Sequence, residues 1–292
     1  LTTSPAGDEL TVSFAKALIE GEKLGQDDVP DYLSVSLSST DYVGHLFGPS
    51  SLESEDQILR LDRQIADLLS FVDERIGIDK TLIVLSADHG AADPPGYLER
   101  YGIPATYINP KEWDTTPGLS RLKERFGIGK ELIKSYFHPY IYLDEEAIAK
   151  SGASQAEVER EVANEVMKLP GVALAVSSTA LATGAYADMP LMRSILKNFS
   201  PSRSGDVFVV FAPHSFINDF DGLTVAAHHG SPWNYDTYVP MIFAGNGLDG
   251  RRVARRVETV DLAPTLAALL GTKPPSGSVG KPLTEVIDAM DD

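Results

Sequence analysis

The chain has 292 residues, of which 43% are hydrophobic, so it is long enough for one large α/β domain or for a domain with an inserted lobe. Its formal net charge of −17 argues against a nucleic-acid-binding surface and against attachment to an anionic membrane. Without cysteine, any metal ion must be held by Asp, Glu or His side chains, and no apolar run approaches the length of a membrane span.

The first elements lead to a candidate ligand pair. Apolar residues recur at helical spacing over 11–24, and residues 31–37 then alternate apolar and polar side chains, which predicts a strand. Asp41 and His45 follow this strand. Their i, i+4 spacing places both on one face of a helical turn, about 5–6 Å apart at Cβ, close enough to chelate one ion.

A second pair follows the next predicted strand. Residues 52–76 have the strongest helical periodicity of the chain, and residues 81–87 form a continuous apolar run typical of a buried parallel strand. This strand ends at Asp88 and His89, which in isolation are as typical of a loop cap and a surface histidine. Because ligands collect beyond the carboxyl ends of strands in α/β sheets, we expect both pairs to lie at one sheet edge.

The stretch from Ala91 to about Gly205 differs in composition from the residues before it, being rich in turn residues, and predicts an inserted α+β lobe. Strands are expected at 140–143 and 171–177, with a helix at 154–169 between them. His138, which precedes a proline in this lobe, is interpreted as a surface or turn histidine. The predicted organisation is a core part over 1–95, an inserted lobe over 96–205, and a second core part over 206–292.

The last part of the chain returns to core-like elements. Residues 207–212 and 239–244 are predicted to be buried strands, and residues 259–270 a helix. Between the two strands lies the adjacent pair His228 and His229. The chain therefore has three separate clusters of Asp and His residues.

Ligand sets made of Asp and His suit Zn²⁺, with Mn²⁺ or Fe as second choices. Two such ions roughly 4 Å apart form the usual clamp for displacement at phosphorus. The residues by themselves therefore predict a metal-dependent hydrolase.

Five motifs make the chain resemble a known family. The chain is similar to the alkaline phosphatase superfamily, and within it to the type I phosphodiesterase/nucleotide pyrophosphatase-like branch of alkaline phosphatases with a threonine nucleophile. The resemblance implies an α/β fold with a mostly parallel central sheet, helices on both faces and a small inserted α+β lobe. The motifs, in chain order, span Ser38–His45, Ser86–Gly90, His228–Pro232, Val239–Gly245 and Val260–Leu266.

The resemblance implies two Zn²⁺ ions in the complete enzyme. Asp41, His45 and His229 would bind the first ion. His229 is preferred to His228 because the family ligand directly precedes a glycine, which leaves His228 as a supporting residue.

Asp88 and His89 would contribute to the second ion. In the family, this ion also needs an aspartate from an early strand and contacts the nucleophilic threonine, and no Asp/Thr combination before Asp41 fits these roles. We therefore expect the segment to be the C-terminal half of an enzyme, inactive without its N-terminal half.

The expected activity is hydrolysis of small-molecule phosphate monoesters through a phospho-threonine intermediate. A phosphodiesterase or nucleotide pyrophosphatase of the same superfamily is the near alternative, and a noncatalytic metal-binding or structural lobe is an alternative of another class. A sulfatase is disfavoured, because relatives with that activity have Asp-Asn where this chain has Asp88-His89. The resemblance also implies a periplasmic or secreted location.

Overall fold

A computed structural model describes residues 1–220 and 222–291, and within them the chain divides into two compact units. The first unit comprises Leu1–Gly90 and Tyr238–Asp292, and the second comprises Ala91–Thr237. The second unit is therefore an insertion in the chain of the first. In the part of the chain that is described, no helix has the length and apolar character needed to cross a membrane.

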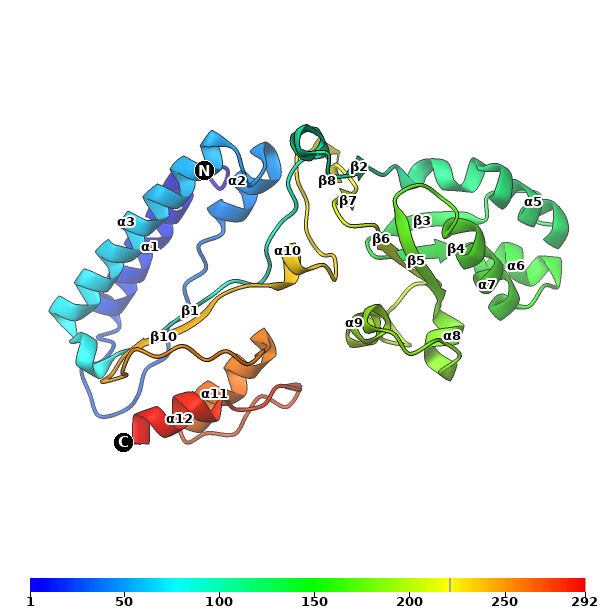
Figure 1. Cartoon of the computed structure of the whole chain (residues 1–292). Helices are drawn as coiled ribbons and strands as arrows, with labels where there is room; N and C mark the ends of the chain where they lie inside the picture. Colours follow the sequence, from blue (N-terminus) through cyan, green and yellow to red (C-terminus); the bar gives the residue numbers. More distant parts are fainter. Residues whose placement is uncertain (221, 292) are drawn as a thin grey trace. The chain divides into compact units, whose positions relative to one another are not determined.

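Helices dominate the start of the first unit. α1 (Pro5–Gly21) packs along α3 (Leu52–Arg75), and α2 (Ser39–Phe47) contacts both (Figure 1). α3 begins at Leu52 because the hydroxyl of Ser51 accepts a hydrogen bond from the Ser54 N–H group at 3.1 Å, an N-cap that satisfies a free amide of the first turn. The helix predicted over 52–76 is thus confirmed to within one residue.

The remainder of the first unit is a two-stranded ribbon and a helical C-terminal part. α11 packs against α12. The elements are η1 (Ile78–Lys80), β1 (Leu82–Ser86), β10 (Met241–Gly245), η4 (Thr259–Asp261), α11 (Leu262–Leu269) and α12 (Thr284–Asp291).

The pairing of β1 corrects one expectation. β1 runs antiparallel to β10, from the pair Leu82 and Gly245 to the pair Ser86 and Met241, whereas its apolar sequence predicted a parallel neighbour buried on both faces. Leu85 of β1 and its cross-strand partner Ile242 of β10 are 42% and 49% exposed. The apolar run therefore identified a strand correctly but overestimated its burial, because one ribbon neighbour covers only one edge and little of either face.

Residues 31–37 also differ from the prediction. The expected alternation is present, because Leu33, Val35 and Leu37 are half-buried while their neighbours are exposed. Within residues 1–220 and 222–291, however, the segment has no hydrogen-bonded strand partner and is not a strand. The strand predicted at 31–37 is therefore not formed, and neither is the strand–helix–strand unit that it would make with the helix at 52–76 and the strand at 81–87, since a strand requires a hydrogen-bonded neighbour as well as an alternating pattern.

The second unit is built around a four-stranded sheet in the order β3-β4-β6-β5, with antiparallel pairing throughout. The strands predicted at 140–143 and 171–177 are confirmed, the latter to within one residue. Successive side chains of β6 point to opposite faces of this sheet, and helices cover both faces. The strands are β3 (Ile133–Phe137), β4 (Tyr140–Leu143), β5 (Val172–Ser177) and β6 (Val207–Phe211).

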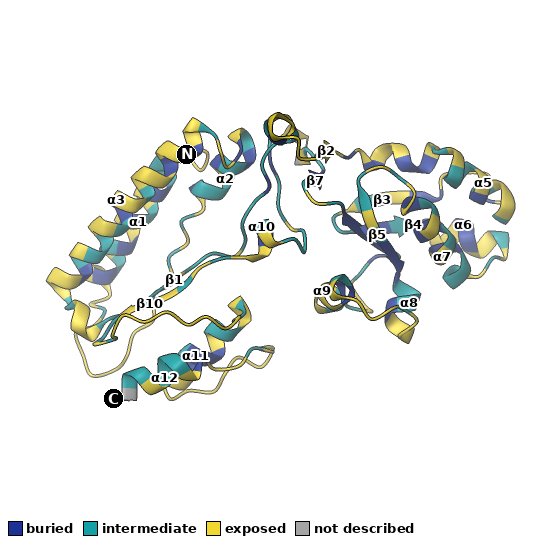
Figure 2. Ribbon diagram, in the orientation of Figure 1, coloured by how far each residue is buried: buried dark blue, intermediate teal, exposed yellow. Residues whose placement is uncertain are grey.

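Every residue of β6 is buried, and Figure 2 colours the centre of the sheet accordingly. Val207, Val209 and Phe211 join the cluster under α5 (Pro117–Phe126), α6 (Glu145–Ser151) and α7 (Gln155–Val166). Phe208 and Val210 join the opposite cluster under α8 (Ser178–Thr183) and α9 (Pro190–Asn198). The second unit is thus an antiparallel sheet between two helical layers, which confirms the α/β class.

The pairing of β6 also bears on domain organisation. The sequence placed residues 206–292 in the core, but residues 206–237 pack with the second unit because β6 pairs with β4 and β5. The predicted lobe, 96–205, lies wholly inside this unit. Its shorter elements are α4 (Pro95–Leu98), η2 (Glu99–Tyr101), β2 (Thr106–Tyr107), η3 (Pro110–Thr115), β7 (Ser215–Phe216), β8 (Asp219–Phe220), β9 (Leu223–Thr224) and α10 (Asn234–Thr237).

Candidate metal centre

Asp41 and His45 lie on α2, as their spacing predicted. The Nε2 atom of His45 is 3.4 Å from Oδ2 of Asp41, and His45 is only 7% exposed. The helix that carries them is held from α1, where the buried carboxylate of Asp8 accepts a hydrogen bond from the Ser39 N–H group at 3.0 Å. A carboxylate at this position accepts a hydrogen bond from a free amide of the first turn of α2, and its negative charge is stabilised by the positive end of the helix dipole.

Asp88 and His89 follow the end of β1 after one residue, Ala87. The strand end is fixed by the hydroxyl of Ser86, which donates to the carbonyl of Pro240 at 2.9 Å. The Nε2 atom of His89 is 3.5 Å from Oδ2 of Asp88 and 4.0 Å from Oδ1 of Asp41. The two predicted ligand pairs therefore meet within the first unit, with Asp41 between the two histidines.

The tautomer of the His89 ring follows from the contact that its Nδ1 atom makes. Nδ1 lies 3.0 Å from the carbonyl oxygen of Gly90, and because a carbonyl only accepts hydrogen bonds, Nδ1 carries the proton. The neutral ring then presents the lone pair of Nε2 to the carboxylates of Asp88 and Asp41. Metal-binding histidines are usually oriented in this way, with the second ring nitrogen donating to a carbonyl or carboxylate.

The distances within each pair fit a shared metal ion. Zinc bonds of 2.0–2.2 Å at tetrahedral angles place two ligand atoms about 3.3 Å apart. The separations of 3.4 Å between Asp41 and His45 and of 3.5 Å between Asp88 and His89 match this spacing and exceed that of a direct hydrogen bond. The donor set, two carboxylates and two imidazoles, suits zinc chemically, so these residues fit the implied metal.

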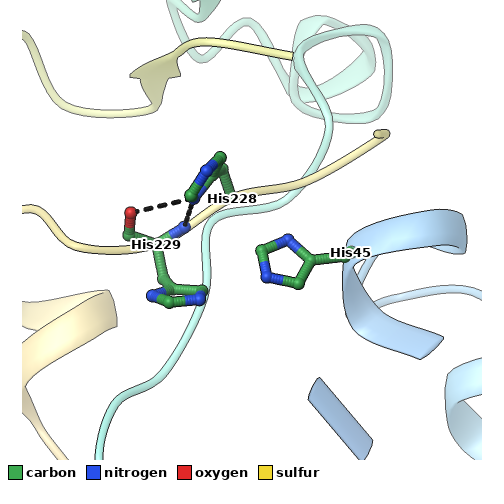
Figure 3. Close-up of side chains that lie close together, drawn as sticks. All are labelled: His45, His228 and His229. Carbon is green, nitrogen blue, oxygen red and sulfur yellow. Dashed lines mark hydrogen bonds between the residues drawn. The ribbon is translucent and has the colours of Figure 1, made fainter. Parts of the chain in front are cut away.

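The histidine pair belongs to the second unit, in the segment between β9 and α10. As Figure 3 shows, the Nδ1 atom of His228 lies against the backbone of His229, and it accepts a hydrogen bond from the His229 N–H group at 2.8 Å. The same atom lies 3.1 Å from the carbonyl oxygen of His229. A carbonyl oxygen only accepts hydrogen bonds, so the two contacts require opposite protonation of Nδ1 and together define no single tautomer.

The peptide groups around His229 are held by other parts of the second unit. The carbonyl of His228 accepts a hydrogen bond from Ala92 N–H at 3.2 Å, and the Ser231 N–H group donates to Oδ2 of Asp236 at 2.7 Å. The carbonyl of Gly230 lies 3.2 Å from Nε2 of His138. His229 is thus presented by a segment anchored on both sides.

His138 lies at the turn between β3 and β4, one of the two interpretations that the sequence offered, and its ring is half-buried and makes specific contacts. Its Nδ1 atom is 3.0 Å from the hydroxyl of Tyr136, and its ring lies 5.6 Å from that of Phe211. Burial lowers the pKa of His138, although the hydrogen bond to the Gly230 carbonyl opposes this shift. Burial likewise raises the pKa of Tyr136. The ring of His138 is therefore neutral at pH 7 and serves as a bridge between β3 and the His229 segment.

The structure thus places the predicted residues in two groups. Asp41, His45, Asp88 and His89 converge within the first unit. The pair His228 and His229 is ordered by contacts within the second unit, and its assignment to a metal stays a prediction.

Sequence reasoning missed two residues that support these groups. Asp8 lies 31 positions before its partner Ser39, and His138 lies 92 positions before Gly230. The sequence held only weak signals for them, namely an acidic residue on the apolar side of α1 and a histidine at a turn beside a predicted strand. Their partners are defined by tertiary contact.

Comparisons with known proteins agree with the motifs. The sequence model of the type I phosphodiesterase/nucleotide pyrophosphatase family matches residues 5–232. Alkaline phosphatase PafA of Elizabethkingia meningoseptica is 34% identical over 293 residues, covering 98% of this chain and 51% of PafA. Alkaline phosphatase PhoV of Synechococcus elongatus is 34% identical over 288 residues, covering 98% of this chain and 50% of PhoV.

The solved structure of wild-type alkaline phosphatase PafA has a TM-score of 0.85 to this chain at 32% identity, covering 97% of this chain and 53% of that one. The chain spans about half the length of the curated relatives it matches. The family match extends over most of the chain and includes every predicted ligand. The chain therefore belongs to the type I phosphodiesterase/nucleotide pyrophosphatase family, in the alkaline phosphatase superfamily.

Proposed function

We propose that this chain is part of a zinc-dependent phosphate monoester hydrolase of the alkaline phosphatase type. In this proposal Asp41, His45 and His229 hold one zinc ion, and Asp88 and His89 contribute to a second. The nucleophile is a threonine in a segment upstream of Leu1, so residues 1–292 are inactive without that segment. A periplasmic or secreted location is part of the proposal and rests on the family resemblance.

The observation that carries this proposal is the convergence of Asp41, His45, Asp88 and His89 in the first unit. Within each pair, the carboxylate and the imidazole have the separation that two ligands of one ion adopt. The tautomer of His89 supports the same role, because its Nδ1–H group is bound by a backbone carbonyl and its Nε2 lone pair faces the carboxylates. The names of the relatives, alkaline phosphatases PafA and PhoV, support the reaction class.

The choice of His229 over His228 rests on the family resemblance, in which the ligand directly precedes a glycine, here Gly230. The Nδ1 atom of His228 lies 2.8 Å from the amide nitrogen and 3.1 Å from the carbonyl oxygen of His229, so the His228 ring lies against the backbone of its neighbour. We therefore assign His228 a supporting role and His229 the role of ligand.

When bound, two zinc ions supply Lewis-acid activation of the nucleophile and charge stabilisation for displacement at phosphorus. The protein residues define where this happens. α2 and the end of β1 orient the oxygen atoms of Asp41 and Asp88, and the backbone carbonyl of Gly90 fixes the imidazole of His89. The first-unit cluster has two carboxylates, so it would repel a phosphate dianion in the absence of metal charge.

A metal and activity measurement on the complete protein, with its upstream half, tests the proposal. We expect two zinc ions per chain, hydrolysis of a phosphate monoester such as p-nitrophenyl phosphate, and much slower hydrolysis of the methyl phosphodiester. Asp41→Ala and Asp88→Ala should each lower the zinc content and reduce activity by several orders of magnitude. Asp62→Ala is a matched control, because this exposed carboxylate lies on α3 of the same unit.

Each alternative has its own result. Faster turnover of the diester would identify a phosphodiesterase. Intact metal binding without hydrolysis of either ester would identify a noncatalytic metal-binding lobe. Less than one zinc per chain, together with full activity of Asp88→Ala, would refute the site assignment.

A further inference from the structure

His138 lies between β3 and β4, at the turn of a hairpin, and connects two parts of the second unit that are far apart in the sequence. Nε2 of its ring is 3.2 Å from the carbonyl oxygen of Gly230, the residue that follows His229. Nδ1 is 3.0 Å from the hydroxyl of Tyr136. Both polar atoms of the ring are therefore used.

The partners determine the direction of both hydrogen bonds. The carbonyl of Gly230 can only accept, so Nε2 of His138 donates to it. In the neutral ring Nδ1 then accepts from the hydroxyl of Tyr136, and the aromatic ring of Phe211 lies 5.6 Å away. A ring held by two hydrogen bonds and an aromatic neighbour has little freedom to turn.

Gly230 has a backbone conformation that depends on such support. Its φ is +99°, a region that residues with a Cβ atom rarely adopt. Glycine also has the greatest freedom to leave any one conformation, so the orientation of the peptide that follows Gly230 must be set by its partners. The carbonyl of that peptide belongs to Gly230 and its partner is His138, whereas Ala92 binds the carbonyl of His228.

We propose that His138 is a positioning residue that fixes the backbone of His229 for zinc binding through its hydrogen bond to the Gly230 carbonyl. This inference rests on the proposed function, since it requires His229 to be a ligand. His138 itself contacts no zinc. Residues that orient metal ligands in this indirect way typically change metal affinity by about 10–100-fold when they are replaced.

The test uses the complete protein, stripped of metal and titrated with Zn²⁺ against a chromophoric chelator. His138→Phe keeps an aromatic ring but removes the donor, and we expect it to weaken the zinc site that His229→Ala also weakens by about tenfold or more. His138→Gln restores an N–H donor at a similar reach and should recover most of the affinity. Tyr140→Phe is a matched control, because it removes a phenol whose partners are Asn198 and Ser204, away from this segment.

The thermal stability of each metal-free variant separates positioning from folding. Reduced zinc affinity in His138→Phe, recovery in His138→Gln and wild-type affinity in Tyr140→Phe would support the proposal. Wild-type zinc affinity in His138→Phe would overturn it, whether or not that variant is less stable. Two tight zinc sites that survive His229→Ala would instead refute the ligand assignment, and with it this inference.

Discussion

Replacing Asp8 by alanine should weaken the first unit and the helix that carries two of the predicted ligands. Asp8 is only 1% exposed, and its carboxylate accepts hydrogen bonds from Ser39 N–H at 3.0 Å and from Nε2 of Gln57 at 2.9 Å. It thus connects α1 to the start of α2 and to the N-terminal part of α3. Gln57 is itself fully buried, so water cannot easily replace the lost acceptor.

The magnitude follows from these two bonds. Hydrogen bonds to a charged acceptor each contribute about 1.5–3 kcal/mol, and the alanine variant leaves two buried donors without their acceptor. We therefore expect Asp8→Ala to lower the free energy of unfolding of the first unit by about 3–6 kcal/mol. For urea m-values of about 1–3 kcal/mol per molar, the unfolding midpoint should fall by at least about 1 M.

Asp8→Asn is the informative partner variant. Among the described residues, Oε1 of Gln57 is buried without a hydrogen-bond partner, so a turned Gln57 amide could accept from the new side-chain NH₂ group. The other oxygen of the new amide would still accept from Ser39. We expect Asp8→Asn to lose only about 1–2 kcal/mol, the charge-assisted part of the two bonds.

Urea unfolding followed by two probes measures the effect where it should occur. Far-UV circular dichroism reports the helices of both units, with α3 the longest of those described, whereas both tryptophans of the chain, Trp113 and Trp233, lie in the second unit. Tryptophan fluorescence therefore shows whether the second unit also changes. A circular-dichroism midpoint for Asp8→Ala within about 0.3 M of wild type, well under the expected shift, would refute the reasoning. Equal losses in the two variants would refute the assigned bonds.

Two further changes concern the second unit. Burial raises the pKa of Asp206, and the negative charges of Glu159 and Glu145 raise it further, whereas its hydrogen bonds from N–H groups lower it. The folded chain should therefore gain stability as pH falls through this raised pKa towards the unfolded value of about 3.9. Asp206→Asn should lack that gain, and an equal stability difference between the two proteins at pH 7 and pH 4.5 would contradict this. Ile141→Ala removes a fully buried side chain of β4 and should cost about 2–5 kcal/mol by tryptophan-monitored unfolding, whereas Phe137→Ala, at a 74% exposed position, should cost far less.

The spacing of apolar and polar residues correctly predicted the elements that have a strong helical or strand periodicity. The long periodic helix α3, the strands β4 and β6 and the i, i+4 pair on α2 all lie where the residues indicated. These features depend on backbone periodicity, which the sequence records directly. The Asp and His residues of the candidate metal site could likewise be identified directly from the sequence.

Features that depend on a distant partner were not predictable. The segment 31–37 has the alternation of a strand, yet pairing requires a neighbour that no local pattern specifies. The apolar run of β1 could not distinguish an antiparallel ribbon from a parallel sheet, and the five apolar residues of β6 could not show which unit they join. In each case the extended, apolar or alternating pattern of the segment is readable from the sequence, whereas the choice of hydrogen-bonded partner is not.

For the candidate site, the sequence by itself determined the ligand types, their local spacing and the family. Only the tertiary structure showed that Asp41 lies between His45 and His89, and that Asp8 and His138 bind the segments that contain predicted ligands. Ligand chemistry is a property of single side chains and is therefore legible in the sequence. Ligand orientation depends on hydrogen bonds between residues tens of positions apart, and these exist only once the chain has folded.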